Sequence, residues 1–125
     1  MKLRIHENSI RLRLKPSEVE TFRRTGKVED TLWFGAGIYL AYGLKASSKT
    51  EVLETVFAEN RLRIVVPRGW VDLWADSDQE GFVGVQPLDG GGTLRIIVEK
   101  DYKCLHRPST EEDGDVFPHP MADGG

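Results

Sequence analysis

The chain opens with KLRIHENSIRLRL at residues 2–14, where apolar and polar or charged side chains alternate. Alternation with a period of two predicts strands that turn one face to a core and the other face to solvent. Glu7-Asn8 divides the stretch, and Asn tolerates the positive φ that tight hairpin turns require. We therefore predict a hairpin with one Leu/Ile face and one face rich in Arg.

The segment after this hairpin carries the signals of a short helix. Ser17, followed by Glu20 three residues later, predicts a capping box at the helix start. Val19 and Phe22 would form the inner stripe of the helix, and Gly26 is a suitable residue to end it. We expect two further strands, at about 27–34 and 37–45, to complete a strand–strand–helix–strand–strand unit.

The same order of elements then repeats along the chain. The second unit is predicted to contain strands at 52–57, 61–66, 80–86 and 93–100, with a short helix around 70–74. A shift of 52 residues places Glu7-Asn8 on Glu59-Asn60 and Phe22 on Trp74. We infer an internal duplication, because the turn, the alternation and the helix stripe all keep phase.

The predicted fold class follows from this duplication. We expect a β-rich α+β protein in which the two units form an antiparallel barrel or a two-sheet sandwich of about eight strands, with the two short helices at its ends. Residues 1–108 would form a single domain with repeats at 1–45 and 51–100, followed by an acidic, Pro-containing tail at 109–125. Aromatic residues are predicted to lie in the core: Phe22, Trp33, Phe34, Phe57, Trp70, Trp74 and Phe82.

Composition narrows the protein class. The chain has 125 residues, of which 39% are apolar and 30% charged, a balance typical of globular proteins. We expect no membrane association, because no apolar run approaches the ~20 residues that span a bilayer. The single cysteine, Cys104, and the charged N-terminal stretch favour a cytoplasmic location. A formal charge of −3 disfavours general nucleic-acid binding.

The charge is unevenly placed. Residues 1–15 hold five Lys or Arg against one Glu, whereas residues 111–125 hold five Asp or Glu and no Lys or Arg. This asymmetry is typical of solvated surfaces, but it also suits an anion-binding face that the acidic tail could cover. Arginine binds carboxylate and phosphate through two parallel hydrogen bonds. The predicted ligand-binding residues are Arg4, Arg11, Arg13 and Arg63.

The C-terminal segment offers a different chemistry. Cys104, His106, Asp115 and His119 are potential zinc ligands, although their spacing does not match the usual zinc motifs. The same Cys104 could act as a nucleophile with His106 or His119 as its base. The alternative interpretation is a buried cysteine beside exposed tail histidines. We predict no cofactor and favour none of these residues as metal ligands.

Several stretches resemble a family of short, uncharacterised bacterial proteins. The resemblance rests on the opening at residues 2–14, on DGGGTL at 89–94, on VEKDYKCL at 98–105 and on FPHP at 117–120. It spans nearly the whole chain and implies no activity. That family often has Asn where this chain has His119, which weakens a histidine-based metal site.

Two functional hypotheses follow from these observations. The first is a non-catalytic module that binds an anionic small molecule or a protein partner on its basic hairpin. The second is a metal- or thiol-dependent enzyme that uses Cys104 with His106, Asp115 or His119.

Overall fold

A computed structural model describes residues 1–102 of the chain. In chain order the elements are β1 (Lys2–His6), β2 (Ser9–Leu14), α1 (Pro16–Thr25), β3 (Lys27–Gly35), β4 (Ile38–Ser47), β5 (Glu54–Ala58), β6 (Arg61–Pro67), α2 (Arg68–Ala75), β7 (Gly81–Pro87) and β8 (Thr93–Lys100). The predicted strand–strand–helix–strand–strand order is therefore present twice. Neither helix is long and apolar enough to cross a membrane. The predicted acidic tail at 109–125 lies outside the described residues.

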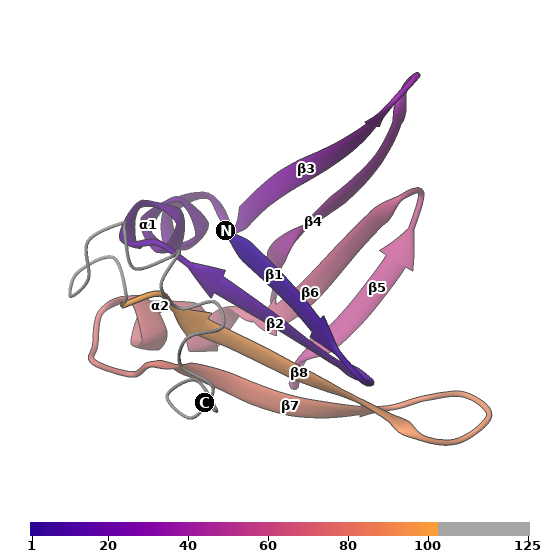
Figure 1. Cartoon of the computed structure of the whole chain (residues 1–125). Helices are drawn as coiled ribbons and strands as arrows, with labels where there is room; N and C mark the ends of the chain where they lie inside the picture. The colour runs from indigo at the N-terminus through magenta and orange to yellow at the C-terminus, as the bar shows by residue number, and fades with distance from the viewer. Residues whose placement is uncertain (103–125) are drawn as a thin grey trace, which may run out of the picture.

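The strands form two four-stranded sheets, with no closed barrel among residues 1–102 (Figure 1). Sheet A has the order β1-β2-β8-β7 and sheet B has the order β3-β4-β6-β5. Each sheet takes one hairpin from each half of the chain. Pairing within the hairpins is antiparallel, as expected, but the strands that join the halves, β2 with β8 and β4 with β6, run parallel. The two halves are thus interleaved into one sandwich.

The two halves of the chain make equivalent hydrogen bonds. The Arg95 amide donates to the Asn8 carbonyl at 3.1 Å, and the Ala41 amide donates to the Asn60 carbonyl at 2.8 Å. Asn60 lies 52 residues after Asn8, at the same place in the second hairpin turn. In each half, the carbonyl of the turn Asn therefore accepts a hydrogen bond from the last strand of the other half. The donor is the residue at which pairing between the two halves begins.

The core lies between the sheets and under the helices. The alternation of β2 is confirmed, because Ile10, Leu12 and Leu14 are all buried. They belong to a cluster that also contains Val19, Phe22, Leu44, Leu53, Ile64, Val66, Val71, Trp74, Phe82, Ile96 and Val98. Burial of such side chains stabilises the fold by about 1.5–3 kcal/mol each.

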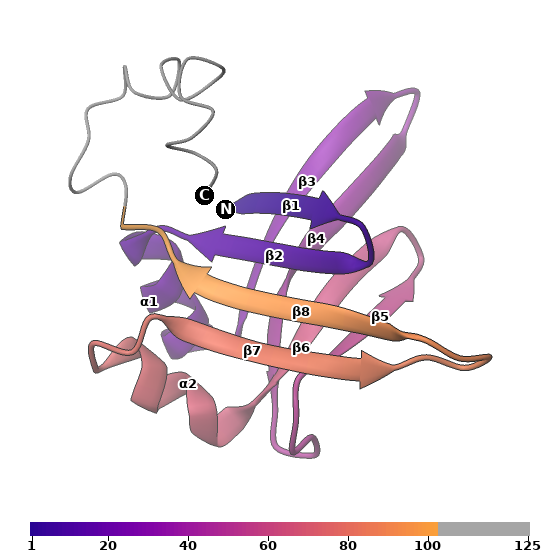
Figure 2. The same cartoon turned by 60° about the horizontal axis from the view of Figure 1, so that its bottom comes forward.

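The helices differ from the prediction in position and in capping. They lie together at one side of the molecule (Figures 1 and 2) and pack through the rings of Phe22 and Trp74, whose centroids are 6.5 Å apart. The prediction of helices at both ends is therefore wrong. The first helix is capped at Lys15, whose amide donates to the Glu18 carboxylate at 2.8 Å, and not at Ser17 with Glu20. Pro16 can occupy the first helical position because no hydrogen bond is required of its nitrogen there.

Three aromatic residues predicted for the core are instead at the surface. Trp33 is 65% exposed, Phe34 63% and Phe57 68%. Trp33 and Phe34 lie where the β3–β4 hairpin extends beyond the rest of sheet B, because β4 pairs with β6 only from Ala41 onward. Phe57 lies one residue from the end of β5. Ile5, at the far end of the inward row of β1, is also 68% exposed.

Candidate anion-binding face

The basic residues of the first hairpin lie side by side on the outer face of sheet A. Arg4 is directly opposite Arg11, and Lys2 is directly opposite Arg13. The neighbouring residues of β2, such as Leu12, point into the core, so these cations point away from it. The sequence pattern alone therefore brings four cationic side chains onto two adjacent strands.

The parallel pairing of β2 with β8 adds two charged residues from the other end of the chain. Arg95 lies beside Ser9, and Glu99 lies beside Arg13. We call the set Lys2, Arg4, Arg11, Arg13 and Arg95 the basic face. Glu99 was not predicted as a site residue, although the alternation of β8 places Arg95 and Glu99 on the same face.

A single carboxylate supports two of the arginines. The Arg13 Nε donates to Glu99 Oε2 at 2.6 Å, and the Arg11 Nη1 donates to the same oxygen at 3.5 Å. The Glu99 side chain is only 15% exposed, compared with 24% for Arg13 and 35% for Arg11. Because Glu99 is shared, it orients both guanidinium groups without neutralising them both.

The other cations have fewer counter-charges. Lys2 Nζ lies 3.6 Å from the carboxylate of Asp101, and the Lys2 side chain is 65% exposed. Within residues 1–102, no carboxylate lies at ion-pair distance from the guanidinium of Arg4. The face therefore presents an excess of positive charge around Arg4.

A cavity of about 360 Å³ adjoins this face at the edge strand β1. It is lined by Met1, Lys2, Leu3, Arg4, Arg11, Arg13 and Tyr42. The Tyr42 hydroxyl donates to the Met1 carbonyl at 3.5 Å. Burial, together with nearby Asp30 and Glu18, raises the pKa of Tyr42 above its usual value, so the phenol stays neutral at physiological pH.

Met1 lines this cavity, and two carboxylates hold its N-terminal amine. It donates to the Glu18 carboxylate at 2.6 Å and to the Asp30 carboxylate at 3.2 Å. Burial alone would lower the pKa of this amine, but the hydrogen bonds and charges of Glu18 and Asp30 outweigh burial and raise it. The amine is thus occupied by the carboxylates of Glu18 and Asp30, so Lys2 and three arginines of the basic face are the remaining cations that line the cavity.

Arg63 lies elsewhere. It belongs to β6 in sheet B, where its Nε is 3.8 Å from the carboxylate of Glu29, and Arg61 Nε is 3.9 Å from the same carboxylate. Neither Nε atom has a hydrogen-bond partner in the described part of the chain. Of the four predicted ligand-binding arginines, the structure brings together Arg4, Arg11 and Arg13 and separates Arg63 from them.

The candidates for metal binding and thiol chemistry belong to the C-terminal segment. Cys104, His106, Asp115 and His119 all lie outside the described residues. Residues 1–102 contain no group of three or more His, Cys, Asp or Glu side chains that could hold a metal ion.

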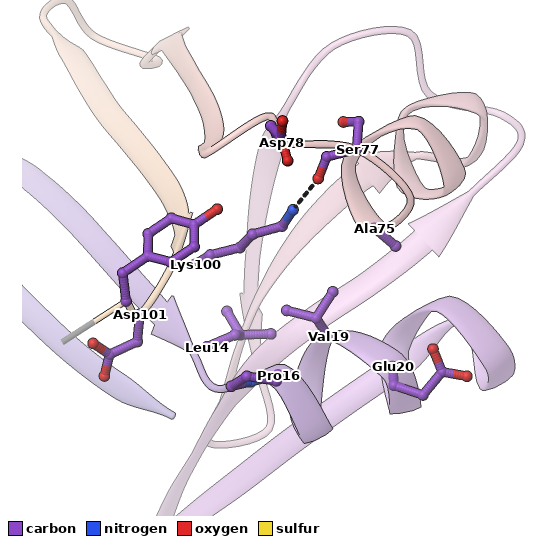
Figure 3. Close-up of a pocket in the computed structure, with 10 residues that line it drawn as sticks. Leu14, Pro16, Val19, Glu20, Ala75, Ser77, Asp78, Lys100 and Asp101 are labelled. Atoms are coloured by element: carbon purple, nitrogen blue, oxygen red, sulfur yellow. Dashed lines mark hydrogen bonds between the residues drawn. The ribbon is translucent and has the colours of Figure 1, made fainter. Parts of the chain in front are cut away.

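A second cavity, of about 330 Å³, lies between the start of α1, the end of α2 and the end of β8 (Figure 3). Sequence reasoning did not find it, because its lining comes from separate segments. Lys100 Nζ donates to the Ser77 carbonyl at 2.8 Å and lies 5.9 Å from the ring centre of Trp74. Glu20 accepts two hydrogen bonds from Arg23, at 3.0 and 2.7 Å. Lys100 and Glu20, two charged residues that line this cavity, are thus already engaged in contacts within the protein.

Comparison with known proteins identifies a family. No curated protein and no solved structure gives a significant match to this chain. A family model described as a family of unknown function (DUF7009) matches residues 1–121, in agreement with the predicted resemblance to an uncharacterised family. The chain belongs to this family.

Proposed function

We propose that the protein is a non-catalytic binding module whose basic face holds a carboxylate or phosphate group of its ligand. The observation that carries this proposal is the placement of Arg4 directly opposite Arg11, with Glu99 as the shared counter-charge of Arg11 and Arg13. The ligand would be an anionic small molecule or an acidic group on a protein partner.

The energetics support a ligand at this position. Like charges directly opposite each other on a sheet are destabilising, by up to about 1 kcal/mol. A bound anion would remove this repulsion and accept charge-assisted hydrogen bonds, which stabilise by about 1.5–3 kcal/mol each. Glu99 would hold Arg11 and Arg13 in place before binding, so that less side-chain entropy is lost when the ligand binds.

The alternative function, a metal- or thiol-dependent enzyme, rests on residues of the C-terminal segment. Nothing in the described residues adds to it, so the binding module is the function the geometry favours. A cytoplasmic location, expected from the single cysteine, is part of the proposal and can be checked by cell fractionation.

Calorimetric titration of the protein with inorganic pyrophosphate at low salt tests this function. We expect Arg4→Gln and Arg11→Gln to weaken binding about tenfold each, since one charge-assisted hydrogen bond is equivalent to about that factor. The control is Arg24→Gln, which removes the same charge from an exposed position on α1. Binding by this control should stay within about twofold of the wild type.

Two results would contradict the proposal. One is an absence of pyrophosphate binding by the wild-type protein at low salt. The other is an equal loss for Arg24→Gln and Arg4→Gln, which would show that only the net charge matters.

A further inference from the structure

The end of the β3–β4 hairpin is an arm without support from the rest of its sheet. Because β4 pairs with β6 only from Ala41 onward, residues 32–40 form two strands that, within residues 1–102, pair only with each other. This segment, which we call the apolar arm, reads LWFGAGIYL and contains no charged residue. Figures 1 and 2 both show the hairpin reaching away from the body of the molecule. Two-stranded ribbons are marginally stable in water.

The apolar arm exposes large side chains on both of its faces. Leu32 is 50% exposed, Trp33 65%, Phe34 63% and Ile38 57%. The rings of Trp33 and Tyr39 contact each other across the two strands, with centroids 5.3 Å apart, and this contact leaves Trp33 largely open to solvent. Contiguous exposed apolar surface of this kind marks an interaction site in soluble proteins.

The duplication supplies an internal comparison. The equivalent hairpin of the second half, β7–β8, ends in the loop PLDGGGT at residues 87–93. That loop is mostly polar or Gly, and it occupies the matching end of sheet A. The architecture therefore does not require an apolar hairpin end. The apolar composition of the arm must therefore be explained by something other than the fold, such as binding.

Within the described part of the chain, the outer edge of the arm has no pairing partner. β3 is the longest of the four edge strands, with 9 residues, and its last part, Thr31–Gly35, is exposed and uncharged. Edge strands are commonly shielded by charge, by Pro or by shortness. β1 carries Lys2 and Arg4, β7 ends at Pro87, and β5 has only 5 residues. Among residues 1–102, only β4 pairs with β3.

We propose that the apolar arm binds a second copy of this chain, by antiparallel pairing of the two β3 edges about a twofold axis within Thr31–Gly35. A second copy satisfies both requirements of the arm, because it supplies apolar surface and also backbone hydrogen-bond partners for the exposed edge. Hydrocarbon would cover the side chains but leave the backbone groups of the edge unpaired, which is costly.

Charge and area agree with this occupant. A twofold axis within Thr31–Gly35 keeps Asp30 and Glu29 away from their own copies, so that no like charges face each other. At about 150–250 Å² for a fully exposed aromatic side chain, the arm presents roughly 400 Å² of apolar side chain per copy. Two copies would therefore bury about 800 Å² of apolar side chain in addition to strand backbone, close to the ~1,000 Å² of a small specific interface, which favours a weak, concentration-dependent dimer.

Sedimentation velocity over a range of protein concentrations tests the proposal. The wild type should pass from monomer to dimer, and Trp33→Lys should raise the dimer dissociation constant at least tenfold. Val85→Lys is the matched control, because Val85 is 58% exposed on β7, the strand equivalent to β3. This control should dimerise within about twofold of the wild type. A wild type that stays monomeric at the highest concentration would overturn the proposal.

Cross-linking provides a second measurement, which identifies the residues that lie at the interface. In a Cys104→Ser background, single cysteines at Thr31, Leu32 and Trp33 should form disulfide-linked dimers on mild oxidation only at the position nearest the twofold axis, because a residue farther from the axis lies too far from its own copy. A cysteine at Val85 should not. Equal cross-linking at Val85 would contradict the β3 interface.

Other occupants of the arm are outcomes of two further measurements. If the wild type binds phosphatidylcholine vesicles and Trp33→Lys does not, the arm binds a lipid surface and not a second copy of the chain. A disulfide within one chain between Cys104 and the cysteine of Trp33→Cys, in a protein that stays monomeric, would show that the C-terminal segment covers the arm. Either result would overturn the proposal as stated.

Discussion

Arg4 lies directly opposite Arg11 across the β1–β2 ladder, and within residues 1–102 no carboxylate is at ion-pair distance from Arg4. A sheet selected for stability alone would place opposite charges at these two positions. The neighbouring Arg13 differs, because its Nε is 2.6 Å from Glu99. Mutating Arg4 and Arg13 separately therefore distinguishes the ligand-binding contribution of the basic face from its structural contribution.

Replacing Arg4 by Thr should stabilise the protein while weakening anion binding. We expect the free energy of unfolding to rise by about 0.2–1 kcal/mol, because the repulsion with Arg11 is removed. Urea denaturation measures this change. Arg13→Thr should instead lower the free energy of unfolding by about 1–3 kcal/mol, because Glu99 loses its closest partner. Destabilisation by Arg4→Thr would mean that Arg4 has a structural role.

The two tryptophans Trp74 and Trp33 should respond differently to truncation. Trp74 is fully buried and its indole donates to the Glu80 carbonyl at 3.0 Å, so Trp74→Ala should lower the free energy of unfolding by about 3–5 kcal/mol. Trp33→Ala should change it by less than about 0.5 kcal/mol in the monomer, because the side chain is 65% exposed. Urea titrations at low protein concentration compare the two. Similar losses would contradict the placement of Trp33 outside the core.

Gly43 and Gly69 should respond in opposite directions to Ala. A Cβ at Gly43 would clash with the backbone of Val28 and Glu29, so Gly43→Ala should destabilise the protein by about 1–3 kcal/mol. Gly69 lies in the first turn of α2, where an added methyl group would meet open space, so Gly69→Ala should stabilise by about 0.5–1 kcal/mol. Thermal unfolding of both variants tests the close approach of β3 to β4. Tolerance of Ala at position 43 would argue against it.

The N-terminal amine should make stability depend on pH. Its pKa is raised above the ordinary value of 8.0, so its contribution is fully present below that value and is lost as pH rises through the folded-state pKa. The free energy of unfolding of the chain beginning at Met1 should therefore fall as pH rises above 8.0. Acetylation of the amine should lower stability at neutral pH and flatten this dependence. An unchanged pH profile after acetylation would contradict the ion pairs with Glu18 and Asp30.

The sequence was a good guide wherever a local period determined burial. Alternation correctly placed Ile10, Leu12 and Leu14 in the core and Arg11 and Arg13 outside it. The element order also followed from local patterns, because each hairpin has its own turn residues and each helix its own apolar stripe.

The sequence was a poor guide to contacts made between the two halves. The pairing of Arg13 with Glu99 depends on which hairpins share a sheet, and no local pattern specifies that choice. For the same reason Arg63 could not be separated from the basic face. Trp33 and Phe34 were wrongly placed in the core because large apolar residues are buried on average, a rule that fails at an exposed hairpin end.

The central claim is that the arginines of sheet A, and not those of sheet B, bind an anion. The most direct test is nuclear magnetic resonance of the arginine Nε–H groups during titration with inorganic pyrophosphate. The Arg4, Arg11 and Arg13 signals should shift together and saturate with one affinity, while Arg61 and Arg63 stay unchanged. Shifts that are spread evenly over all arginines, or that are confined to Arg61 and Arg63, would contradict it.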